Sequence, residues 1–136
     1  MELKTEILLP GDAVTGACLA LTAPISFWGG VDPTSGAIID ARHPERGQTV
    51  AGRILALPGT IGSSSASAVL LELVHAGKAP TALLMDAPDA ILLLGLVVAR
   101  EMGWPTPPAF RLPAADQKAL ASRTVTISAE GRITTV

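Results

Sequence analysis

The residues best suited to chemistry lie in one glycine-rich stretch near the middle of the chain, residues 59–67. Three consecutive serines, Ser63, Ser64 and Ser65, follow Gly62 there. Such hydroxyls can cap a helix, hold an anion, or supply one activated oxygen to a reaction. The plainer interpretation is that one serine caps a helix and the others fill a loop, because serine is a preferred N-cap residue. The local pattern by itself leaves both interpretations open.

Two regular elements must position these serines. Residues 50–57 are mostly apolar and end at Pro58, which predicts a strand. After the serines, apolar residues recur three and four positions apart, which predicts an amphipathic helix with its stripe at Ala66, Val69, Leu70, Leu73 and Val74. A turn from a strand into a helix presents backbone N–H groups and the positive end of the helix dipole. We therefore expect the serine stretch to suit a carboxylate or a phosphate.

An aromatic and glycine-rich motif is the second candidate for function. Phe27 and Trp28 precede Gly29 and Gly30, and the carboxylate of Asp32 follows shortly after. Paired glycines permit a ligand or another chain to approach the backbone closely. The motif is either an interface or pocket wall, or an ordinary turn with two core aromatics.

Three basic side chains require an interpretation. His43 lies in a polar loop, where it is either a base or phosphate carrier, or a surface residue. Arg53 belongs to the strand before the serines and could reach an anion there, or it could lie on a solvated face. His75 falls in the last turn of the serine helix and is interpreted as structural, since a cation suits that end of the dipole.

Composition excludes several classes of function. The net charge of −2 and the lack of a basic run give no electrostatic case for binding nucleic acid. The single cysteine, Cys18, cannot form an internal disulfide or hold a metal cluster alone, and we expect it to be buried. The uncharged run 90–99 falls short of the roughly 20 residues that span a bilayer. We expect a cytoplasmic protein with no membrane association.

The remaining pattern predicts a single mixed α/β domain over residues 1–136. The helix expected at 89–102 is apolar nearly all round, so this domain or another chain should cover both of its sides. Pro88 would lie in its first turn, with Asp86 or Ala87 as the cap. A weaker helix is expected at 116–121. The expected strands are 5–8, 14–21, 37–40, 50–57, 81–85 and 109–112, with a closing hairpin at 124–128 and 132–136.

Several blocks of the sequence, in this order and spacing, resemble one family. They are residues 26–32, 36–40, 43–44, 52–55, 58–59, 62–65, 71–73 and 77–80. Together they resemble the small subunit, or swivelling domain, of the aconitase X family. The resemblance implies a swivelling β/β/α fold like the mobile domain of aconitase, with mixed sheets and central helices. It also implies a separate large subunit that carries an iron–sulfur cluster or metal, with no cofactor in this chain.

The resemblance further implies a hydro-lyase. Members of the family dehydrate cis-3-hydroxy-L-proline, our first choice of substrate, or mevalonate 5-phosphate, the alternative. In similar enzymes a serine in a Gly-Ser-Ser turn is the base that removes the proton next to the substrate carboxylate, and Ser63 matches that serine here. Gly62, Ser64, Ser65 and Arg53 would then bind the substrate. Two other classes stay open: a phosphohistidine carrier using His43, and a non-catalytic assembly module.

Overall fold

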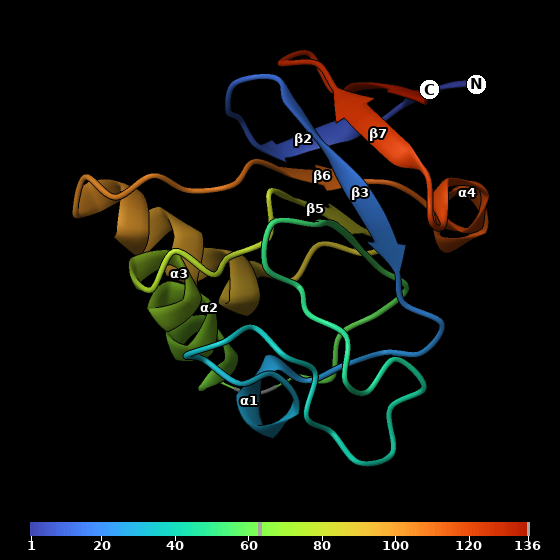
Figure 1. Cartoon of the computed structure of the whole chain (residues 1–136). Helices are drawn as coiled ribbons and strands as arrows, with labels where there is room; N and C mark the ends of the chain where they lie inside the picture. Colours follow the sequence, from blue (N-terminus) through green and yellow to red (C-terminus); the bar gives the residue numbers. More distant parts are fainter. Residues whose placement is uncertain (63, 136) are drawn as a thin grey trace.

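A computed structural model describes residues 1–62 and 64–135, so Ser63 and Val136 lie outside the described residues (Figure 1). The strands are β1 (Glu2–Lys4), β2 (Glu6–Leu9), β3 (Val14–Ala20), β4 (Ile54–Leu57), β5 (Ala82–Met85), β6 (Ala109–Arg111), β7 (Thr124–Ile127) and β8 (Arg132–Thr135). The helices are α1 (Phe27–Gly30), α2 (Ala66–His75), α3 (Ala90–Glu101) and α4 (Ala114–Gln117), and the short 3-10 turn η1 (Lys118–Leu120) continues α4.

The described strands form one mixed sheet in the order β1-β8-β7-β3-β4-β5-β6-β2. The four central strands, β3 to β6, run parallel to one another, and the strands on either side of them pair antiparallel. The parallel strands have their carboxyl ends at one edge of the sheet, which is where ligands bind in open α/β sheets.

The two outermost strands, β1 and β2, are consecutive in the chain, so the sheet curls round to bring its ends together. Thr5 joins them, and its N–H donates to the carbonyl of Gly131 at 3.0 Å. Gly131 has a φ of +85°, and a Cβ there would lie 2.5 Å from the Thr5 hydroxyl oxygen. Glycine is therefore required at this closure.

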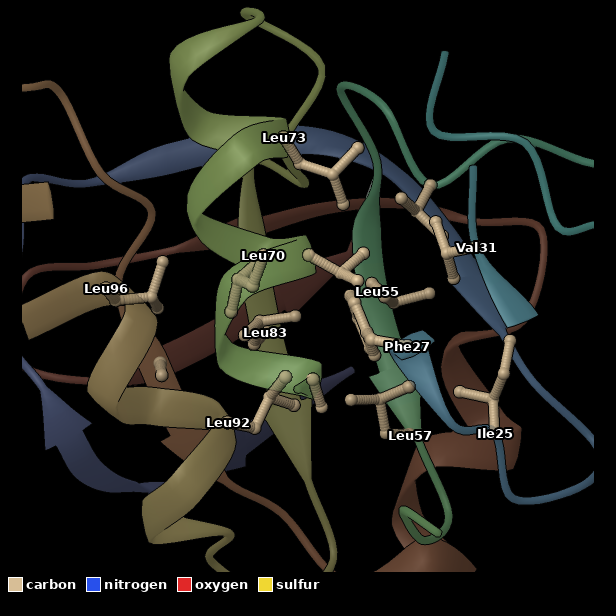
Figure 2. Close-up of a cluster of buried hydrophobic side chains, with 14 of the residues drawn as sticks. Ile25, Phe27, Val31, Leu55, Leu57, Leu70, Leu73, Leu83, Leu92 and Leu96 are labelled. Carbon is tan, nitrogen blue, oxygen red and sulfur yellow. The ribbon is translucent and has the colours of Figure 1, made fainter. Parts of the chain in front are cut away.

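Side chains of the central strands alternate between two apolar clusters. On β4, Ile54 and Ala56 join the inner cluster, which fills the curled sheet with Cys18, Ala82, Leu84, Phe110, Leu112, Leu120, Val125, Ile127 and Ile133. Leu55 and Leu57 point the other way, toward α2 and the segment that contains Phe27 (Figure 2). Because all four residues of β4 are buried, the strand shows no alternation of polar and apolar residues.

Helices α2 and α3 lie side by side on the outer face of the sheet (Figure 1). Leu92 and Leu96 of α3 pack toward Leu70 of α2 (Figure 2). Their close approach depends on Gly95, because a Cβ there would lie 2.4 Å from the carbonyl oxygen of Ser67. This chain covers only one side of α3, since Leu94 remains 53% exposed, so the expected cover of the other side would have to come from another chain.

Most expected elements are confirmed, and the differences have local causes. The strand at 50–57 begins only at Ile54, because residues 51–53 form a turn in which Gly52 takes a φ of +70°. In the expected strand 37–40, only Ala37 and Ile38 pair, each through an isolated bridge. The cap of α3 is Asp89, which accepts from the N–H of Leu92 at 3.0 Å, and not Asp86 or Ala87. None of the helices in the described chain has the length and apolar character needed to cross a bilayer.

Candidate functional site

Three loops meet at the carboxyl edge of the parallel strands. They are the segment after β3 (21–31), the loop after β4 that leads through the serine stretch into α2 (58–65), and the turn after β5 (86–89). The first two are joined by backbone pairing, since Ile25 bridges Thr60 and the N–H of Ile61 donates to the carbonyl of Ile25 at 3.0 Å. The serine stretch therefore lies at the edge where such sheets bind ligands.

The described part of the serine stretch is open to solvent. Gly62, Ser64 and Ser65 are all exposed, and a Cβ on Gly62 would meet no atom within 4 Å. Ser65 is the N-cap of α2, and the hydroxyl of Ser67 donates to the carbonyl of Ser64 at 3.3 Å. Ser63, the predicted base, lies outside the described residues. The stretch combines the start of a ten-residue helix with accessible hydroxyls, which suits an anionic ligand.

A side-chain bridge ties this stretch to the next loop. The hydroxyl of Thr60 donates to Oδ2 of Asp89 at 2.7 Å, while Oδ1 of the same carboxylate caps α3. Sequence reasoning missed both residues as parts of the site, because 29 positions separate them. The sequence signal for the cap was Asp89 itself, an aspartate directly before the apolar run that begins at Ala90.

The aromatic motif divides its two rings between the core and the surface. Phe27 is 1% exposed and packs beside β4 (Figure 2). Trp28 is 61% exposed. Gly29 has a φ of +77°, which allows the tight turn, and α1 contacts α2. Gly30 is buried, and its carbonyl accepts from the N–H of Ile39 at 2.9 Å. The motif therefore holds Trp28 outward on the same edge as the serine stretch.

The carboxylate of Asp32 accepts hydrogen bonds from Thr34, within its own turn. Its Oδ1 accepts from the N–H of Thr34 at 2.8 Å and from the Thr34 hydroxyl at 2.7 Å. These hydrogen bonds favour the charged form, so the pKa of Asp32 lies below its ordinary value. The carboxylate stabilises the turn at 32–36 by this contact.

His43 is buried and engaged at both ring nitrogens, contrary to the expectation of a surface residue. Its side chain is 6% exposed, Nε2 lies 3.0 Å from the carbonyl oxygen of Ala23, and Nδ1 accepts from the N–H of Glu45 at 3.1 Å. Nε2 therefore carries the proton, because a carbonyl can only accept. A ring that joins two loops in this way has neither nitrogen available to carry a phosphate.

Arg53 is not brought to the serines. It precedes the first residue of β4, whereas the serine stretch follows the last, so four strand residues of about 3.3 Å each separate the two ends. Arg53 instead lines a surface hollow of about 350 Å³ that extends to Glu45 and to Thr22, in the segment after β3. A cation that sequence reasoning missed, Arg111, does lie at the carboxyl edge, where its Nε donates to the carbonyl of Asp86 at 3.0 Å. The sequence signal that could have placed Arg111 there was its position near the end of the expected strand 109–112.

The described residues contain no group of three His, Cys, Asp or Glu side chains that could hold a metal ion. Cys18 is 2% exposed within the inner apolar cluster, and burial raises the pKa of its thiol to about 11. A thiol in that environment is a poor metal ligand and nucleophile, because both roles require the thiolate.

Comparison with known proteins identifies the family. The family model of the aconitase X swivel domain matches residues 2–135. The chain is an aconitase X swivel domain. The crystal structure of Thermococcus kodakaraensis aconitase X in its holo-form agrees with this, with a TM-score of 0.86, 29% sequence identity, and coverage of 100% of this chain and 98% of that chain.

Named relatives of this swivel domain are dehydratases. The chain is 50% identical over 101 residues to the cis-3-hydroxy-L-proline dehydratase of Pseudomonas aeruginosa, covering 71% of this chain. It spans only 17% of that enzyme's length. It is 38% identical over 99 residues to the phosphomevalonate dehydratase small subunit of Thermococcus onnurineus, covering 73% of this chain and 75% of that subunit. The same domain thus occurs within a long polypeptide and in a protein named as a small subunit.

Within the swivel domain, the structure brings together part of the set of residues predicted from the sequence. Gly62, Ser64 and Ser65 share the carboxyl edge with Trp28. Phe27, Gly30 and His43 are buried, and Asp32 bonds within its own turn. Arg53 precedes the amino end of β4. The structure adds three residues that were not predicted from the sequence as parts of the site: Thr60, Asp89 and Arg111.

Proposed function

We propose that this swivel domain is the small subunit of a two-subunit hydro-lyase that dehydrates cis-3-hydroxy-L-proline. The observation that carries the proposal is the 50% identity over 101 residues to an enzyme named for that reaction. The exposed serine stretch at the start of α2 supports it, because a hydroxy acid brings a carboxylate that suits a helix N-terminus.

Ser63, as the alkoxide, is proposed as the base that takes the proton from the carbon next to the substrate carboxylate. A carbon–carbon double bond forms as hydroxide leaves the neighbouring carbon, and the proton passes from Ser63 to the hydroxide, which gives water and restores the alkoxide. Serine in water keeps its proton at neutral pH, so the site must stabilise the alkoxide strongly. The positive end of the α2 dipole favours a negative charge near the start of this helix. Gly62, Ser64 and Ser65 would supply donors to the base or to the substrate carboxylate.

We assign the metal centre of the enzyme to the large subunit. As the family resemblance implies, an iron–sulfur cluster or metal ion in the enzyme would belong to that partner. The partner would close over the carboxyl edge, where the serine stretch and Trp28 are exposed. The length of the Pseudomonas enzyme is consistent with this arrangement, since the region matched by this chain is 17% of it.

Mevalonate 5-phosphate is the second candidate substrate. The identity of 38% to the Thermococcus small subunit favours it, together with the 75% coverage of that subunit, which makes the two chains comparable in length. A phosphate would call for cationic side chains near the serines. Arg111 lies at the same edge of the sheet, with its Nε donating to the Asp86 carbonyl, and the partner could add others.

The substrate assignment is tested with the complex of this chain and the aconitase X large subunit of the same organism. Water elimination is measured on cis-3-hydroxy-L-proline and on mevalonate 5-phosphate under the same conditions. The proposal expects turnover of the proline derivative and little of the phosphate. Turnover of mevalonate 5-phosphate alone would move the assignment to the second candidate, and turnover of neither by an assembled complex would refute both.

A further inference from the structure

Helix α3 carries an exposed apolar stripe. Its members are spaced along one side of the helix: Ile91, Leu94, Val97, Val98 and Met102, which are 50%, 53%, 43%, 37% and 53% exposed. No charged residue occurs from Ala90 to Ala99. The adjoining side of α3 packs on α2, through Leu92, Gly95 and Leu96. Large contiguous apolar surface of this kind marks interaction sites.

The α3 stripe is continuous with the candidate site. Helix α3 starts at Asp89, whose carboxylate binds Thr60 of the serine stretch, so the first residue of the stripe lies two positions beyond that bridge. A shallow hollow of about 170 Å³ connects the stripe to α2, with Leu94 and Val98 on one side and Ser67 and Leu71 on the other.

Two further exposed apolar side chains lie in the loops of the site edge. Ile61, in the serine stretch itself, is 55% exposed, and Trp28, in the loop paired to it, is 61% exposed. Both side chains would be buried by a partner that closes over this edge.

We propose that the α3 stripe is the docking surface for the large subunit, and that it meets an apolar, uncharged patch on that subunit. The inference rests on the proposed function, in which the partner closes over the serine edge. A large subunit bound at the serine edge would contact the amino end of α3, which is next to that edge. It could then bury the uncharged α3 stripe along the length of the helix. A second copy of this chain on the stripe would crowd the edge that the partner needs.

The proposal is tested by measuring the Kd between this chain and the aconitase X large subunit of the same organism. Leu94→Asp and Val97→Asp each place a charge in the stripe. Ala119→Asp, at an exposed position of η1, adds the same charge away from α3. Both stripe variants should bind about tenfold or more weakly, with the control unchanged. Thermal melting should shift little in all three, because each altered side chain is largely exposed.

Each outcome separates the two proposals. Equal binding by wild type and both stripe variants would overturn the docking surface while leaving the two-subunit function intact. No binding by wild type would overturn both. Tight binding of wild type without turnover of either substrate would refute the substrate assignment alone. Sedimentation of the isolated chain completes the test: if wild type is a dimer and Leu94→Asp a monomer that still binds the large subunit, the stripe is a self-association surface.

Discussion

The hydroxyl of Thr60 lies 2.7 Å from Oδ2 of Asp89, and the other oxygen of that carboxylate caps α3 through Leu92 at 3.0 Å. One side chain thus fixes both the stretch that leads to the serines and the start of the helix beside it. Positioning of this kind matters for catalysis, because small misplacements of a reacting group reduce the rate steeply.

Removing the Thr60 hydroxyl should reduce turnover more than stability. For Thr60→Val we expect an unfolding free energy lower by about 1 kcal/mol, from one lost hydrogen bond, and a kcat lower by about 10- to 100-fold. Thr60→Ser keeps the hydroxyl and should recover most of the rate. Wild-type kcat in Thr60→Val would show that the bridge to Asp89 has no positioning role.

Replacement by alanine should lower stability at Gly95 and have little effect on stability at Gly62. A Cβ on Gly95 would lie 2.4 Å from the backbone oxygen of Ser67, whereas one on Gly62 would meet nothing within 4 Å. Gly95→Ala should therefore lower the unfolding free energy by about 1–3 kcal/mol, because α3 must move away from α2. Gly62→Ala should change it by less than about 0.5 kcal/mol. Urea denaturation measures both, and equal effects would contradict the packing described for α2 and α3.

Stability should fall in alkaline solution through Cys18. Its pKa is about 11 in the folded chain against 9.0 for an exposed thiol, because burial disfavours the thiolate. The unfolded chain therefore loses this proton first, and the unfolding free energy decreases from about pH 9 upward by an amount approaching ~2 kcal/mol near pH 11. Chemical denaturation of wild type and Cys18→Ala across this range isolates the effect. Parallel pH profiles for the two proteins would contradict it.

Local pattern predicted the elements that carry strong periodicity. The apolar spacing from Ala66 to Val74 predicted α2, and the short run at 81–85 predicted a strand buried on both faces. The position of Arg53 was misjudged because the turn at Gly52 shortens the strand and leaves the arginine at its amino end. Gly52 itself was the available signal, because a glycine within a strand pattern weakens the strand and often marks a bend.

Long-range contacts were beyond sequence reasoning. The burial of His43 depends on the carbonyl of Ala23, 20 positions away, so a histidine in a polar loop gave no sign of it. The Thr60–Asp89 bridge is equally non-local. Residues 62–65 were identified from composition and resemblance, and the structure adds that their described members are exposed at the carboxyl edge.

The most direct test of the account is turnover by the assembled two-subunit complex with Ser63, Ser64 and Ser65 replaced in turn by alanine. Removing a general base typically costs about 10²- to 10⁴-fold in rate. We predict a loss of that size in Ser63→Ala, smaller losses in the other two, and unchanged affinity for the large subunit in all three. Wild-type turnover in an assembled Ser63→Ala complex would contradict the assignment of Ser63 as the base.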